Sequence, residues 1–174
     1  MKATHRTLIS RSRLQRRIAV LGKRISRDYR DKRPVLVGVL RGSFVFLADL
    51  IRAIDTPVEV DFISVGSYGD ATASSGVVRL LQDLGTSIKG RHVILVEDIV
   101  DTGLTLHYLI DNLRTREPRS LAVCALLDKR VKRRVRVPLK YAGFVIPDRF
   151  VVGYGLDHAQ LHRNIPHISW IEER

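Results

Sequence analysis

The sequence predicts an α/β fold, in which a central, mostly parallel sheet is flanked by helices and joined by a small irregular hood. Two runs of strand length, at 35–40 and 93–96, consist almost entirely of valine, isoleucine and leucine, as strands buried on both faces of a parallel sheet do. Each run is followed by a glycine-containing turn and then by a helical pattern. The 174 residues, 45% of them hydrophobic, can bury one sizeable core, so we expect a single domain over residues 1–174.

Helical and strand patterns alternate through the first half of the chain. Four aliphatic residues recur at helical spacing between positions 14 and 25, which predicts an amphipathic helix over 10–30 with Ser10 as a candidate N-cap. We therefore describe residues 1–33 as a basic N-terminal helical segment. The following patterns predict a strand at 35–40, a helix at 44–54, a strand at 57–65, a mobile loop at 66–76 and a return strand at 77–82.

The second half begins with the strongest apolar run, which predicts a central strand over 91–100. A helical pattern then extends from the turn after Asp101 to about residue 116, and 121–127 is expected to be the next parallel strand. Prolines and glycines interrupt 138–174, so this part is expected to be mostly hood and C-terminal tail rather than another βαβ unit.

The formal net charge of +12 is concentrated in two segments. Residues 1–33 carry twelve Lys or Arg against two Asp, and 129–136 carries six cations and no acid. A solvated helix face explains the first segment more simply than an anionic partner does, although nucleic acid, a second protein and a polyphosphate substrate stay open. No run is long and apolar enough to span a bilayer or to form a secretory signal, which predicts a cytoplasmic protein. The single cysteine, Cys124, is expected to be a small buried hydrophobe.

The most informative pattern lies at 93–105. The predicted central strand delivers Glu97 and Asp98 at its carboxyl end, where open parallel sheets bind their ligands. The next turn combines backbone N–H groups, threonine hydroxyls and a helix N-terminus, which together form a cradle for phosphate. An adjacent acidic pair implies solvent, a metal ion or hydroxyl donors. From residue types alone, Asp101 serves equally well as a simple helix cap.

The whole pattern resembles the phosphoribosyl-pyrophosphate signature of the type I phosphoribosyltransferases: two acids, two apolar residues, Asp-Thr-Gly and a later Thr. Other segments are similar to the hypoxanthine-guanine phosphoribosyltransferases in particular, and the matches are collinear from about residue 35 to 168. These segments are Leu-Arg-Gly at 40–42, Ser-Tyr at 67–68, the stretch 79–84, Leu-Leu-Asp-Lys at 126–129, the hood at 145–157 and Arg-Asn-Ile-Pro at 163–166. The resemblance implies the type I phosphoribosyltransferase fold.

The resemblance also implies a magnesium-dependent enzyme of purine salvage, which transfers a phosphoribosyl group from phosphoribosyl pyrophosphate to hypoxanthine, guanine or both. Glu97 and Asp98 would hold the ribose hydroxyls, directly or through Mg²⁺, and Asp157 would be a further metal ligand. Asp101 would be the general base. The 5′-phosphate would bind to the turn formed by Asp101, Thr102, Gly103, Leu104 and Thr105.

The remaining roles implied by the resemblance concern the base and the pyrophosphate. Lys129 would donate to the 6-oxo group, Phe150 would stack on the purine and Val151 would bond its edge through the backbone. Residues expected to bind pyrophosphate or close over it are Arg41, Gly42, Ser67, Tyr68 and Arg163. In relatives the peptide bond that corresponds to Leu40–Arg41 is cis.

Two further expectations concern partners and a competing class of protein. The resemblance suggests a homodimer or homotetramer. A regulator of the same fold that binds RNA or DNA is the competing hypothesis, but it has no need of a base-binding hood, so Lys129, Phe150 and Asp157 argue against it. His158 and His162 lack the neighbours that a zinc site needs, and Trp170 is expected to pack rather than to react.

Overall fold

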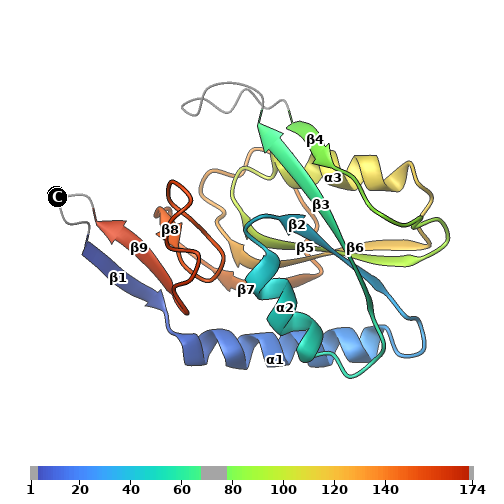
Figure 1. Cartoon of the computed structure of the whole chain (residues 1–174), viewed down its shortest axis with the longest axis horizontal. Coiled ribbons are helices and arrows are strands. Elements are labelled where there is room, and N and C mark those ends of the chain that lie inside the picture. The colour runs from blue at the N-terminus through green and yellow to red at the C-terminus, as the bar shows by residue number, and fades with distance from the viewer. Residues whose placement is uncertain (1–3, 68–77, 173–174) are drawn as a thin grey trace.

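The computed structural model describes residues 4–67 and 78–172. Its elements follow the order β1 (Thr4–Ile9), α1 (Arg11–Asp28), β2 (Val35–Leu40), α2 (Phe44–Arg52), β3 (Glu59–Ser67), β4 (Val78–Gln82), β5 (His92–Val100), α3 (Leu104–Arg114), β6 (Ser120–Asp128), β7 (Tyr141–Val145), β8 (Val151–Val152) and β9 (Ile168–Glu172). In this part of the chain, six strands form a central sheet of order β4-β3-β2-β5-β6-β7, and three form a small sheet of order β1-β9-β8. Figure 1 shows the small sheet at one end of the molecule, with α1 running beside both sheets.

The middle strands of the central sheet, β2, β5 and β6, are buried on both faces, as their apolar runs predict. All its neighbouring strands are parallel except β3 and β4. Side chains alternate across β2: Leu36 packs with α1 and α2, whereas Val35, Val37 and Val39 pack with α3. Both faces therefore need aliphatic residues, which explains the nearly continuous apolar runs. Cys124 on β6 is fully buried in this core, as expected.

The three predicted helices are confirmed with small shifts at their ends. Helix α1 begins at Arg11, and the Ser10 hydroxyl accepts a hydrogen bond from the Arg13 N–H at 3.4 Å, so the predicted N-cap is present. Its apolar stripe, made of Leu14, Ile18, Leu21 and Ile25, is buried. Within the described residues, no helix has the length and apolar character needed to cross a membrane.

The N-terminal segment is not helical throughout, contrary to the prediction for residues 1–33. Thr4–Ile9 forms strand β1, which pairs antiparallel with Ile168–Glu172. The partner lies more than 150 residues away in the sequence. A short strand that forms only by pairing with so distant a segment has little sequence pattern of its own from which to predict it. The pairing attaches the start of α1 to the small sheet and so to the hood.

The prediction that 138–174 is mostly hood is also wrong in part. Strand β7 (Tyr141–Val145) joins the central sheet parallel to β6, as its edge strand. An edge strand pairs on one side only, and its glycine and neighbouring prolines are tolerated there. Of the loop predicted at 66–76, Gly66 and Ser67 are the last residues of β3, and positions 68–76 lie outside the described residues.

Candidate active site

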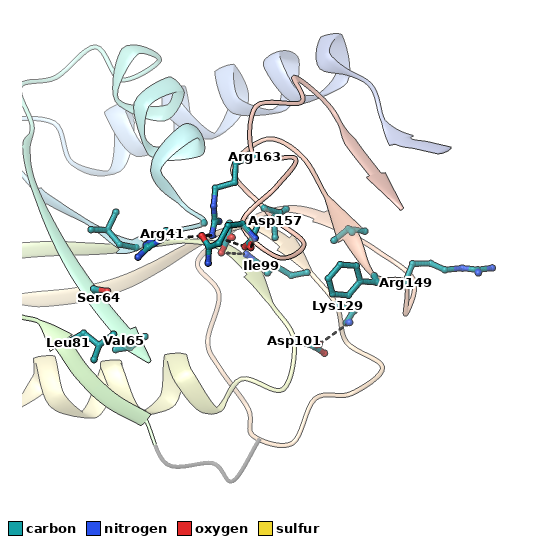
Figure 2. A pocket seen from close by; sticks show the side chains of 17 residues that line it. Arg41, Ser64, Val65, Leu81, Ile99, Asp101, Lys129, Arg149, Asp157 and Arg163 are labelled. Atoms are coloured by element: carbon teal, nitrogen blue, oxygen red, sulfur yellow. Dashed lines mark hydrogen bonds and ion pairs between the residues drawn. The ribbon is translucent and has the colours of Figure 1, made fainter. Parts of the chain in front are cut away.

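A cavity opens at the carboxyl ends of the parallel strands, beside the hood, and we call it the main cavity because most of the predicted site residues line it. It has a volume of about 450 Å³ and is lined by residues from β2, β3, β4, β5 and the hood, and by Lys129, which directly follows β6. Figure 2 shows side chains from these elements converging on one space. Nine of the predicted site residues line it: Arg41, Gly42, Asp98, Asp101, Lys129, Phe150, Val151, Asp157 and Arg163. The structure therefore brings together residues that are up to 122 positions apart.

A second, smaller cavity of about 100 Å³ lies at the N-terminus of α3. Glu97, Asp101, Thr102, Gly103 and Thr105 are among its lining residues. Gly103 has a φ of 86° and directly precedes the helix, so the turn needs a residue without a side chain there. The helix N-terminus and the threonine hydroxyls give this cavity the donors that favour an anion.

The adjacent acids of β5 serve different cavities. Glu97 lines the small cavity and Asp98 lines the main one, because successive side chains of a strand leave from opposite faces. Burial raises the pKa of Glu97 well above its ordinary value, and the neighbouring Asp98 raises it further. Burial also raises the pKa of Asp98 to about 6. Glu97 Oε2 has no hydrogen-bond partner within the protein, so it is available to a ligand.

Lys129 forms the centre of a charged group at the mouth of the main cavity. Its Nζ lies 2.9 Å from Asp101 Oδ2 and 3.2 Å from Asp148 Oδ1, and its side chain is only 9% exposed. Figure 2 shows Lys129 and Asp101 pointing toward each other. Burial lowers the pKa of Lys129, but the hydrogen bonds from its ammonium to the two carboxylates outweigh burial and leave that pKa raised. The cation is therefore kept charged in a nearly dry position.

Two arginines and a glutamine form a second polar group in the main cavity. The guanidinium of Arg163 lies 2.8 Å from Asp157 Oδ1 and also donates to the Gly155 carbonyl at 2.8 Å. Gln160 Oε1 accepts from both Arg41 and Arg163, each at 3.1 Å. The Gln160 N–H donates to Asp157 Oδ2 at 2.8 Å. Two cationic groups are thus held side by side by the protein itself.

The hood and the loop after β2 pack closely against each other. A Cβ atom added to Gly155 would lie 2.2 Å from the Gly42 carbonyl oxygen, and one added to Gly42 would lie 1.7 Å from Asp98 Oδ2. Neither glycine leaves room for a side chain. The Leu40–Arg41 peptide bond is cis, as the family resemblance implies.

Phe150 and Val151 lie next to each other in the hood, with opposite exposures. The Phe150 ring is 58% exposed and meets the His158 ring edge-on, with ring centroids 5.3 Å apart. Val151 is buried in β8. A large aromatic side chain that lines a cavity and is left half uncovered offers a surface for stacking.

Some predicted residues fall outside the two cavities, and some lining residues were not predicted. Leu104 begins α3 without lining either cavity; its N–H donates to Thr102 Oγ1 at 3.4 Å. Ser67 ends β3, and Tyr68 lies outside the described residues. Sequence reasoning missed Asp148 and Gln160. Asp148 lies within the hood motif, which could have drawn attention to it, whereas no sequence signal distinguishes Gln160.

The carboxylates that could hold a metal ion are divided between the cavities. Asp98 and Asp157 both line the main cavity, whereas Glu97 lines the small one. Over 4–67 and 78–172, no group of three or more His, Cys, Asp or Glu residues gathers around one point. Mg²⁺ commonly takes one or two protein carboxylates and completes its shell with water and substrate phosphates. The arrangement therefore fits a magnesium ion that arrives with a phosphorylated substrate better than a fully protein-bound one.

The family model of the phosphoribosyl transferase domain matches residues 10–159, which is most of the chain. The hypoxanthine phosphoribosyltransferase of Haemophilus influenzae is 50% identical over 165 residues, which are 93% of this chain and 92% of the relative. The hypoxanthine-guanine phosphoribosyltransferase of Bacillus subtilis is 45% identical over 94% of this chain and 91% of its own length.

Solved structures agree with these sequence relatives. The crystal structure of a hypoxanthine-guanine phosphoribosyltransferase from Bacillus anthracis has a TM-score of 0.93 and 47% identity, covering 98% of this chain and 100% of that one. A Trypanosoma cruzi hypoxanthine phosphoribosyltransferase in a ternary substrates complex has a TM-score of 0.89 and 44% identity, covering 98% and 96%. The chain belongs to the hypoxanthine-guanine phosphoribosyltransferase family.

Proposed function

We propose that this protein transfers the 5-phosphoribosyl group of phosphoribosyl pyrophosphate to a 6-oxopurine, hypoxanthine or guanine, and so makes IMP or GMP and pyrophosphate in purine salvage. Family membership and the names of the relatives support the reaction. The observation that carries the assignment of roles is the Lys129–Asp101 pair beside the uncovered ring of Phe150. It offers a donor, a carboxylate and a stacking surface to one flat heterocycle.

The base is proposed to lie in the main cavity, against Phe150. Lys129 would donate to the 6-oxo group and Asp101 would take or orient the proton on the purine nitrogen that attacks the ribose. The backbone of Val151 would bond the edge of the base. An adenine amino group would face the ammonium of Lys129 donor to donor, which disfavours adenine.

The ribose 5′-phosphate is proposed to occupy the small cavity. Its lining of Thr102, Gly103 and Thr105 at the start of α3 supplies N–H and O–H donors in fixed positions. The ribose would then lie between the two cavities, beside Glu97 and Asp98. Burial raises the pKa of both acids, and positive charge that develops on the sugar in the transition state would favour their ionised forms, which would in turn stabilise that charge.

Pyrophosphate is proposed to bind at the cations of the main cavity, Arg41 and Arg163, next to Gly42. Asp98 and Asp157 would hold Mg²⁺ together with phosphate oxygens, and the ion would neutralise charge on the leaving pyrophosphate. A phosphate that pairs with Arg163 would also release Asp157 from that arginine and free its oxygens. The Ser67–Tyr68 pair stays a prediction for closure over the substrates.

The assembly of the protein is also a proposal. Family resemblance favours a homodimer or homotetramer, and we infer that the chain associates with itself in one of these forms. Light scattering coupled to size-exclusion chromatography tests this, since a particle with the 19.7 kDa mass of a single chain contradicts it.

The reaction is tested by incubating the protein with phosphoribosyl pyrophosphate, Mg²⁺ and, separately, hypoxanthine, guanine, xanthine or adenine, and following nucleotide formation. Hypoxanthine, guanine or both should react, and adenine should not. The Asp101→Asn variant should lose about 10²- to 10⁴-fold in kcat because it lacks the base. Asp111→Asn is the matched control, since Asp111 is an exposed acid on α3 that lines neither cavity. If no base reacts in the presence of Mg²⁺, the proposal is wrong.

A further inference from the structure

The basic segment between β6 and β7 contains one arginine that is largely buried. Most cations of 129–136 outside the main cavity are exposed, as expected of a solvated turn, but the Arg133 side chain is only 19% exposed. It lines neither the main cavity nor the small one; together with Asp128 and Arg130 it lines a third cavity, of about 670 Å³, which contains none of the predicted site residues. A largely buried guanidinium is costly unless its donors are satisfied, so its partners indicate what it does.

Arg133 binds the backbone of the turn that carries Asp101. Its Nε donates to the Asp101 carbonyl at 2.9 Å, and its Nη2 donates to the Val100 carbonyl at 3.2 Å. The neighbouring backbone reinforces this attachment, because the N–H groups of Arg134 and Val135 donate to the Thr102 carbonyl at 2.9 and 3.3 Å. A Cβ added to Gly103 would lie 3.1 Å from Arg133 Cδ, so the arginine stem also packs under the turn.

The same guanidinium binds the strand end that carries Lys129. Arg133 Nη2 lies 2.5 Å from Oδ1 of Asp128, whose side chain is 5% exposed. Asp128 is the residue directly before Lys129, and the Lys129 N–H donates to the Val100 carbonyl at 2.9 Å. Arg133 therefore bridges the end of β5, which leads to Asp101, and the end of β6, which leads to Lys129.

We propose that Arg133 is a positioning residue, which sets the distance between Asp101 and Lys129 without touching the substrate. The inference rests on the proposed function, in which these two side chains act on one base. A planar guanidinium reaches two carbonyls and a carboxylate at once, whereas an ammonium has a single nitrogen and cannot span the three. Since a displacement of about 1 Å can cost about 10²-fold in rate, the bridge affects turnover.

Arg130 provides a matched comparison in the same segment. Its Nε lies 2.7 Å from Oδ2 of the same Asp128 carboxylate, but its side chain is 67% exposed and none of its described bonds reaches the Asp101 turn. Arg130→Gln removes the same charge from the same carboxylate and leaves the bridge in place. Comparing Arg130→Gln with Arg133→Gln therefore distinguishes two effects: the loss of a cation near Asp128 and the loss of the attachment to the Asp101 turn.

The experiment compares Arg133→Gln, Arg133→Lys and Arg130→Gln in three measurements: kcat per folded protein, KM for each substrate, and amide hydrogen exchange across 100–106. Arg133→Gln should lower kcat about 10- to 100-fold, with faster exchange in that turn. Arg133→Lys should recover only part of the loss. Arg130→Gln should stay within about twofold of the parent, as expected for an exposed ion pair. If Arg133→Gln does not fold, Arg133→Lys carries the same comparison.

The inference is overturned by unchanged kcat and unchanged exchange on replacing Arg133, and also by an equal loss of kcat in Arg130→Gln. A purely structural role for Arg133 would lower the thermal midpoint and leave kcat per folded protein unchanged, which also overturns it. If the parent protein itself forms no nucleotide, the proposed function fails instead, and exchange at 100–106 still decides whether Arg133 holds the turn.

Discussion

The ammonium nitrogen of Lys129 lies 2.9 Å from the carboxylate of Asp101, although 27 residues and a helix separate them in the chain. The contact follows from the register of β5 and β6, in which Val100 pairs with Asp128, the residues directly before the two. Neighbouring parallel strands end at the same edge of a sheet. Asp101 and Lys129, which directly follow these two strands, therefore lie close together. In the proposed function, the base would bind with one atom facing Lys129 and another facing Asp101.

Replacing Lys129 with glutamine should lower kcat/KM for hypoxanthine by about a hundredfold, because it removes a buried cation from between two carboxylates. The preference for hypoxanthine over adenine should also weaken, which steady-state kinetics with both bases measures. Lys132→Gln is the control: Lys132 lies 3.4 Å from the same Asp148, but it is 60% exposed and lines neither cavity. Equal losses in the two variants would contradict a special role for Lys129.

The stability of the ligand-free protein should fall as the pH rises through the titration of Asp98. Burial raises its pKa from 3.8 to about 6, with Asp157 adding to the rise and Arg163 opposing it. Between these values the folded state binds more protons than the unfolded state, so stability decreases with rising pH. Asp98→Asn should therefore stabilise the protein at pH 8 by up to about 3 kcal/mol, and by only about 0.5 kcal/mol at pH 4.

Denaturant unfolding at the two pH values measures this effect in metal-free buffer. Asp55→Asn, at an exposed position, is the control and should change stability little at either pH. An Asp98→Asn variant that is less stable than the parent at pH 8 would show that the buried carboxylate is favourable to folding.

Replacing Gly155 with alanine should weaken the binding of phosphoribosyl pyrophosphate. Gly155 has a φ of 100°, and a Cβ there would lie 2.2 Å from the Gly42 carbonyl, so the hood and the loop after β2 must separate. Gly90→Ala is the control, since Gly90 also has a positive φ, 69°, but nothing lies within 4 Å of the added atom. Both variants should lose about 1 kcal/mol or more of stability to backbone strain. Only Gly155→Ala should raise the KM for phosphoribosyl pyrophosphate, and a similar rise in Gly90→Ala would refute the explanation.

The single thiol should be inert in the folded protein. Burial raises the pKa of Cys124 to about 12, so neither access nor the thiolate that reacts with disulfide reagents is present near neutral pH. Labelling with a chromogenic disulfide should be undetectable in native buffer and complete in denaturant. Rapid labelling of the native protein, with or without loss of activity, would contradict this.

The central elements were predictable because their signals are local. The runs at β2 and β5 contain enough valine, isoleucine and leucine to indicate strands buried on both faces. The aliphatic residues of α1 recur at helical spacing within the helix itself, so no distant contact is needed to predict it. The motif at 93–105 placed Glu97, Asp98 and Asp101 at strand β5 and the turn after it, where the structure has them. The cis bond at Leu40–Arg41 came from the family resemblance and not from the residues themselves.

The errors concern features that depend on distant parts of the chain. Strand β1 exists because β9 pairs with it, and β7 joins the sheet because β6 offers a free edge. Two site features were missed for a similar reason. Gln160 and Arg133 form their hydrogen bonds to segments that are distant in the sequence. These bonds can be recognised only in the folded structure, and the residue types alone do not predict them.

The pairing of β1 with β9 has a practical consequence for engineering. Thr4 and Glu172 are register partners, so the polypeptide nearly closes into a ring on the side of the small sheet. A short polar linker could join these positions, and new termini could be opened at the exposed turn around Gly90, which lines neither cavity. A circularly permuted protein built this way should keep the order of the strands in both sheets and the residues that line the two cavities.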